Sequence, residues 1–158
     1  MVTRVLLAAI LGVVSACATG CGDSGPKLYS VKGKVSVDGK PASDATVFFH
    51  RKGRENPNEP VPYGKCAPDG SFALTTSKEG DGAQAGEYVV TVVWPDMSKA
   101  PDGNGGRPDL LRGAYDKAAK SAIKATVEAK DNQVPEITLT IPKAPAPKEP
   151  TGGIKTDK

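Results

Sequence analysis

The chain has 158 residues, a net charge of +3 and few aromatic residues (5%), whereas glycine (18) and proline (14) are abundant. This composition favours turns over long helices. The lysine and arginine residues are scattered, so the chain lacks the basic stripe with interleaved aromatic residues that a nucleic-acid-binding surface requires. We therefore expect no nucleic-acid partner.

Residues 1–21 have the layout of an export signal. Arg4 provides a positively charged start, residues 5–14 form an apolar run, and small residues precede Cys17 and Cys21. The run is too short to span a bilayer, which takes about 20 apolar residues. The segment resembles the signal of bacterial lipoproteins, in which a cysteine is lipidated and becomes the new N-terminus.

The lipoprotein pattern favours Cys17 as the lipidated residue, because Val14 supplies a branched apolar side chain three positions earlier. Cys21, with Ala18 in that position, is the alternative, and an ordinary cleaved signal peptide is a further interpretation. The resemblance implies a diacylglycerol thioether, often with a third acyl chain, and two or three chains hold a domain on a membrane. We expect a lipid-anchored protein of the cell envelope, at the outer membrane, its periplasmic face or the cell surface.

Residues 22–28 are short and polar with glycine and proline, which predicts a flexible tether. A β-domain is expected over residues 29–142, because apolar and polar side chains alternate there with the period of two that is typical of half-buried strands. The alternating segments are 30–37, 45–50, 63–66, 71–76, 86–94, 122–130 and 134–141. Segment 86–94 is apolar on both faces, so it is expected to be central.

The segments between the predicted strands are turns and loops. Asp38-Gly39 and Asp69-Gly70 are typical of tight turns. Residues 109–121 are expected to hold one or two helical turns, with Asp109 as the N-cap. Residues 143–158 are rich in proline and lysine and predict a disordered tail, with a proline-rich docking segment as the alternative.

Together, these segments predict an all-β fold: a seven-stranded antiparallel Greek-key β-sandwich, with a closed barrel as the alternative. Residues 31–41 and 45–49, the Asp-Gly-Ser-Phe run at 69–72, and residues 86–92 resemble the ordered motifs of carboxypeptidase regulatory-like domains. The resemblance implies a transthyretin-like sandwich. In that family such domains are folding, spacing or binding modules rather than the peptidase itself.

Catalytic and metal-binding patterns are weak in this sequence. His50 is the single histidine and stands at a strand end beside Arg51, where a solvated residue is expected rather than a base. There is no G-x-S-x-G elbow, and the chain lacks the histidines and the C-terminal motif of the transthyretin-related hydroxyisourate hydrolases. Residues 96–104 carry oxygen donors without the spacing of a calcium loop. We expect no cofactor and no metal.

Cys66 is expected to be a half-buried small residue, and it could pair with Cys21 if Cys17 is lipidated. Tyr63 and Tyr115 are candidate ligand-stacking residues, whereas Trp94 is in phase with Tyr88 and is expected to pack in the core.

Three functions follow from these features. The first is a membrane-anchored, non-catalytic envelope binding or structural module. The alternative is a carbohydrate- or peptide-recognition domain that acts for a partner enzyme, with an envelope protein or glycan as ligand. The third is a hydrolase that depends on His50.

Overall fold

The computed structural model describes residues 25–54, 56 and 58–143. The predictions for Cys17, Cys21 and the rest of the export signal lie outside these residues. So does the predicted tail beyond Lys143.

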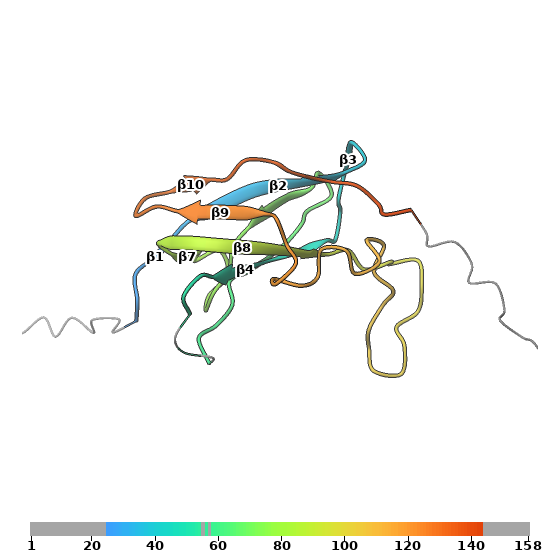
Figure 1. The fold of residues 1–158 in the computed structure, drawn as a ribbon, viewed down its shortest axis with the longest axis horizontal. Helices are drawn as coiled ribbons and strands as arrows, with labels where there is room; N and C mark the ends of the chain where they lie inside the picture. Colours follow the sequence, from blue (N-terminus) through green and yellow to red (C-terminus); the bar gives the residue numbers. More distant parts are fainter. Residues whose placement is uncertain (1–24, 55, 57, 144–158) are drawn as a thin grey trace, which may run out of the picture.

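The described residues form an all-β fold of eleven strands in three sheets and contain no helix (Figure 1). In chain order the strands are β1 (Leu28–Tyr29), β2 (Val31–Val37), β3 (Lys40–Pro41), β4 (Thr46–Arg51), β5 (Tyr63–Lys65), β6 (Ser71–Ala73), β7 (Ala83–Gln84), β8 (Gly86–Val93), β9 (Lys124–Val127), β10 (Asn132–Gln133) and β11 (Ile137–Leu139). Each predicted strand segment contains one of these strands, and β1, β3, β7 and β10 are additional short pairings. The prediction of an all-β fold is confirmed.

The four-stranded sheet has the order β5-β4-β8-β9, and all its neighbours are antiparallel. The longest pairing joins β4 to β8, from Thr46 opposite Val93 to Arg51 opposite Tyr88. Strand β8 lies between β4 and β9, which confirms that segment 86–94 is central.

The five-stranded sheet is built around β2. Strands β3 and β6 pair with β2 in the antiparallel direction, whereas β10 and β11 pair with it in parallel. The expectation of a purely antiparallel sandwich is therefore wrong for this sheet. After β9 the chain turns through residues 128–131 and crosses to the other sheet, where it runs in the same direction as β2.

The core lies between the two larger sheets. Phe49 has its ring centroid 5.8 Å from that of Tyr88 and 6.2 Å from that of Phe72, and all three side chains are buried. Trp94 packs against this core, and its Nε1 donates a hydrogen bond to the Ser43 carbonyl at 2.8 Å. This confirms the interpretation of Trp94 as a packing residue.

The two sheets join along one side of the sandwich and remain apart along the other. On the joined side, the backbones of Tyr63 and Thr75 exchange two hydrogen bonds of 2.9 and 2.7 Å. On the other side, β9 and the β10–β11 segment border a cleft of about 220 Å³ with mainly apolar lining. The two sheets are therefore hydrogen-bonded to each other along one side only, and they do not form the closed barrel that was the alternative.

The short helix expected over residues 109–121 is absent, and turns take its place. Arg112 and Gly113 have φ angles of 56° and 71°, in the left-handed region that ends a right-handed helix. Asp109 nevertheless caps backbone amides as an N-cap would: its Oδ1 accepts from Leu111 N at 3.0 Å and its Oδ2 from Gly113 N at 2.8 Å.

The described chain begins and ends at opposite ends of the sandwich (Figure 1). It enters beside β1 and β7 and leaves beyond β11, near the long loop that follows β8. Within the described ranges, no helix has the length and apolar character needed to cross a membrane.

Candidate binding face

The face of the four-stranded sheet that points away from the core carries the aromatic residue with the most exposure. Along β4, Val47 and Phe49 point inward and are fully buried, so the intervening residues point outward. We call this surface the outer face. Its members are Thr46, Phe48, His50, Tyr63, Lys65, Glu87, Val89, Thr91, Val93, Lys124 and Thr126.

Tyr63 and Phe48 form an aromatic pair on the outer face. They lie directly opposite each other on β5 and β4, with ring centroids 6.4 Å apart and ring planes tilted by 35°. Tyr63 is 45% exposed, whereas Phe48 is half-buried. Tyr63 was predicted from the sequence as a stacking residue, whereas Phe48 was not. The signal was present, because Phe48 alternates out of phase with the core residue Phe49.

His50 stands on the same strand, two residues beyond Phe48. Its Nε2 lies 2.9 Å from Thr91 Oγ1, and Thr91 is almost fully buried. Burial of the imidazole, followed by the nearby positive charge of Arg54, lowers the pKa of His50 below its ordinary value of 6.5. The ring is therefore neutral at pH 7, and it is hydrogen-bonded to the Thr91 hydroxyl on the neighbouring strand β8.

Tyr115, the second predicted stacking residue, belongs to a different part of the molecule. Its hydroxyl donates to the Thr140 carbonyl at 3.2 Å, and its own carbonyl accepts from Val92 N at 2.9 Å. The ring packs against the core. Because Tyr63 lies on edge strand β5 and Tyr115 lies beyond the opposite side of β8, the structure does not bring the two side chains into one site.

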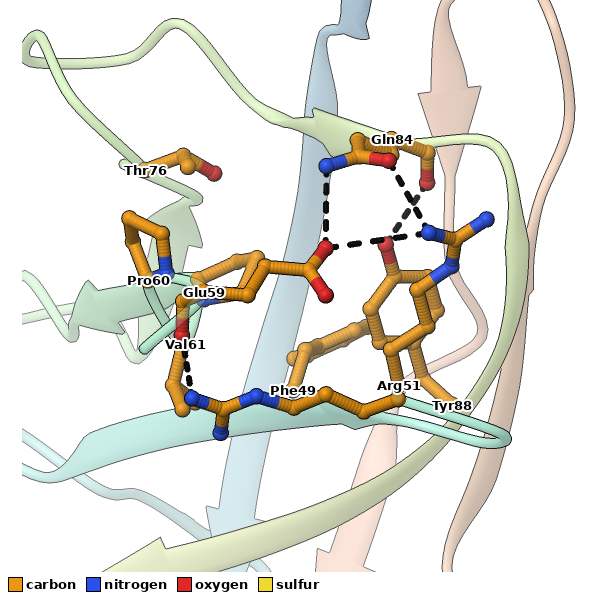
Figure 2. Close-up of a pocket in the computed structure, with 10 residues that line it drawn as sticks. Phe49, Arg51, Glu59, Pro60, Val61, Thr76, Gln84 and Tyr88 are labelled. Carbon is orange, nitrogen blue, oxygen red and sulfur yellow. Dashed lines mark hydrogen bonds and ion pairs between the residues drawn. The ribbon is translucent and has the colours of Figure 1, made fainter. Parts of the chain in front are cut away.

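A polar cluster lies beside β7, the strand that pairs with β1, and Figure 2 shows its side chains. Glu59 Oε1 accepts from Gln84 Nε2 at 2.9 Å and lies 3.7 Å from Arg51 Nη1. Arg51 Nη1 also donates to Gln84 Oε1 at 3.0 Å, and the Tyr88 hydroxyl donates to the Gln84 carbonyl at 2.7 Å. The enclosed space of about 10 Å³ is at most the size of one water molecule. This cluster therefore fastens the loop after β4 to β7 and β8.

The remaining reactive side chain is Cys66, which is buried and has no disulfide partner among the described residues. Burial, followed by the negative charge of Asp69, raises the pKa of its thiol from 9.0 to about 11. The thiol is therefore protonated at neutral pH and is a poor nucleophile. In the parts of the chain that the structure describes, no three histidine, cysteine, aspartate or glutamate residues are arranged to hold a metal ion.

No family model and no curated protein matches the chain. Among solved structures, it is similar to a DUF3823 family protein from Parabacteroides merdae, with a TM-score of 0.37, 13% identity, and coverage of 74% of this chain and 47% of that one. It is also similar to a 9R-lipoxygenase from Cyanothece, with a TM-score of 0.39, 15% identity, and coverage of 82% and 19%. The chain thus spans less than half the length of either protein, and the similarities say nothing about activity.

Proposed function

We propose that this chain is an exported, lipid-tethered β-sandwich that binds a component of the cell envelope at its outer face and catalyses no reaction. The observation that carries the proposal is the exposed Tyr63 ring beside Phe48 on the outer face of the four-stranded sheet. A large aromatic ring held in this way is typical of binding surfaces.

The proposed tether is short. From Cys17 to Leu28 the chain extends at most about 40 Å, and from Cys21 about 25 Å, at roughly 3.3–3.6 Å per residue. The end of the sandwich that carries β1 would therefore stay close to the membrane. The outer face runs along the side of the sandwich, where it would remain accessible to envelope components.

The proposal also includes the carboxypeptidase regulatory-like, Greek-key identity of the domain. The motif residues fall on β2, β4, β6 and β8, the strands that build the two larger sheets. That placement supports the resemblance. The Greek-key order in which the strands are connected is part of the proposal.

Binding is favoured over catalysis by the state of the two reactive side chains. His50 is neutral and hydrogen-bonded to Thr91, and Cys66 is buried and protonated. The hydrolase alternative uses His50 as its base, so it predicts that His50→Ala would abolish the hydrolysis catalysed by the full-length protein. We expect no such activity.

Two measurements on the full-length chain test the proposal. In a bacterium that processes lipoproteins, the wild type should fractionate with membranes and the Cys17→Ala/Cys21→Ala double variant should not; the two single variants identify the lipidated residue.

The second measurement tests binding. The soluble double variant should sediment with isolated envelope fragments, and adding Tyr63→Ala should reduce that binding. Met97→Ala is the matched control, because Met97 is similarly exposed (53%) but lies in the loop after β8. Membrane retention of the double variant, or equal sedimentation with and without Tyr63, would contradict the proposal.

A further inference from the structure

The backbone beneath the aromatic pair offers no hydrogen bonds to a ligand. On edge strand β5, the amide and carbonyl of Tyr63 are bonded to the backbone of Thr75. Strand β4 lies between β5 and β8, so its amide and carbonyl groups are committed to the two neighbouring ladders. A ligand on this face is therefore recognised by side chains alone. This requirement disfavours an extended peptide, which gains much of its affinity by pairing its backbone with a free strand edge.

The centre of the outer face is also uncharged. The aromatic pair is flanked by hydroxyl, imidazole and apolar side chains. The charged members of the face lie around this centre: Lys65 opposite Thr46, Glu87 near the start of β8, and Lys124 on β9, three strands from Tyr63. Lys65 Nζ lies 2.9 Å from Asp44 Oδ1, and Lys52 Nζ lies 3.0 Å from Glu87 Oε2. His50 adds a ring that is neutral at pH 7. An uncharged centre complements an uncharged ligand, because a charged group over the aromatic pair would lose hydration without gaining an ionic partner from the centre of the face.

The chemical groups present match those of a sugar ring. The faces of Tyr63 and Phe48 offer apolar, electron-rich surface to the C–H groups of a pyranose. Hydrogen-bonding groups stand beside them: the Tyr63 hydroxyl, the Thr46 hydroxyl and His50 Nδ1, for which the described residues provide no partner. Few polar groups placed around an aromatic surface are the usual means of orienting a small ligand.

We infer that the outer face binds a neutral glycan, with a pyranose ring stacked on Tyr63 and Phe48 and its hydroxyl groups bonded to His50 and Thr46. The inference rests on the proposed function and names the ligand class of the same face. Tyr63 provides the main stacking surface because it is the more exposed ring. Phe48 supports that ring from the neighbouring strand.

A peptide ligand would be expected elsewhere. The outer edge of β9 has no neighbouring strand among the described residues, and the apolar cleft beside it is lined by Ile123, Ala125 and Ile137. A peptide that added to this edge could place alternate side chains in the cleft. Binding there would leave the outer face untouched, so the two ligand classes can be separated by the position of the bound molecule.

The test uses the soluble full-length Cys17→Ala/Cys21→Ala variant and four neutral probes: cellohexaose, maltohexaose, xylohexaose and chitohexaose. Isothermal titration calorimetry should detect saturable binding of at least one of them. Tyr63→Ala should weaken that binding tenfold or more, whereas Tyr63→Phe should stay within about threefold because it retains the ring. Met97→Ala should bind as the parent does. An unchanged circular dichroism spectrum and unfolding midpoint verify that Tyr63→Ala is folded.

Several results would overturn the inference. One is the absence of saturable binding by all four probes at millimolar concentration. Another is binding that survives Tyr63→Ala, and a third is a set of amide chemical-shift changes confined to Lys124–Val127. If Tyr63→Ala abolishes envelope sedimentation while no glycan binds, the proposed function stands and the ligand class is wrong. If Tyr63→Ala leaves envelope sedimentation unchanged and no glycan binds, the proposed function and the ligand class are both wrong.

Discussion

Gly33 of β2 lies directly opposite Phe72 of β6, and the Phe72 ring fills the space that a side chain at position 33 would need. A Cβ atom at Gly33 would lie 2.6 Å from Cζ of Phe72 and 2.5 Å from Cγ2 of Val134. The glycine of the first strand motif therefore has a packing role: it lets the buried side chains of Phe72 on β6 and of Val134, just after β10, close over β2.

Gly33→Ala should consequently destabilise the domain. Overpacking of a core costs about 1–3 kcal/mol, because the added methyl group forces the Phe72 ring and the Val134 side chain to shift. Urea unfolding followed by the fluorescence of Trp94, the single tryptophan, measures the change. Gly103→Ala is the control, because a Cβ there meets no atom within 4 Å and it should change the free energy of unfolding very little. Equal stability of the two variants would refute the packing role.

Asp109 should be a structural residue of the long loop after β8. Its carboxylate accepts hydrogen bonds from the amides of Trp94, Leu111 and Gly113 at 2.8–3.0 Å. Asp109→Ala leaves these amides without their partner and should cost about 1–3 kcal/mol in unfolding free energy. Asp102→Ala removes a comparable pair of bonds, to Asn104 N and Gly106 N, from a fully exposed turn. It should cost less than half as much, and the reverse order would contradict this account.

Glu59 should hold the loop after β4 in place. It contacts Arg51 and Gln84, and its side chain is only 21% exposed (Figure 2). Glu59→Ala should accelerate amide hydrogen exchange in residues 52–62 and lower the stability by about 1 kcal/mol. Glu87→Ala breaks an exposed pair with Lys52 and should leave exchange in this loop unchanged. Identical exchange in the two variants would show that the cluster does not fasten the loop.

The buried thiol of Cys66 should make the folded state less stable in alkali. The folded thiol keeps its proton up to a pKa of about 11, whereas the unfolded thiol loses it near 9.0. Its contribution is therefore fully present below pH 9 and is lost as the pH rises from 9 to 11. Urea unfolding of the wild type and of Cys66→Ala between pH 8 and 11 measures it, because the comparison cancels other groups such as Tyr88, whose pKa is also raised by burial. Parallel pH profiles would contradict the assignment.

Side-chain alternation predicted the strands well, because it reports which face of a strand is buried. Segment 86–94 was apolar on both faces and proved to be the central strand β8. Alternation carries no information on strand direction, so the parallel pairing of β11 with β2 could not be predicted from it. That pairing depends on the chain crossing from one sheet to the other after β9, and this crossing is decided by tertiary packing rather than by local sequence.

The helix predicted from the local sequence of residues 109–121 does not form, because the backbone geometry of this segment prevents it. Asp109 was recognised as a capping residue, but the left-handed backbone at Arg112 and Gly113 prevents the helix that it would have started. The candidate site was predicted in part: Tyr63 was selected from the sequence as a stacking residue, and it is exposed. Its pairing with Phe48 required the register of β4 against β5, and the separation of Tyr115 required the sheet order.

Tandem mass spectrometry of the N-terminal peptide of the protein, purified from membranes of its native host, tests the central claim most directly. The mature chain of a lipid-anchored protein should begin at Cys17, or at Cys21, with a diacylglycerol thioether on that cysteine. A chain that begins at Met1, or an unmodified cysteine at the mature N-terminus, would contradict that claim.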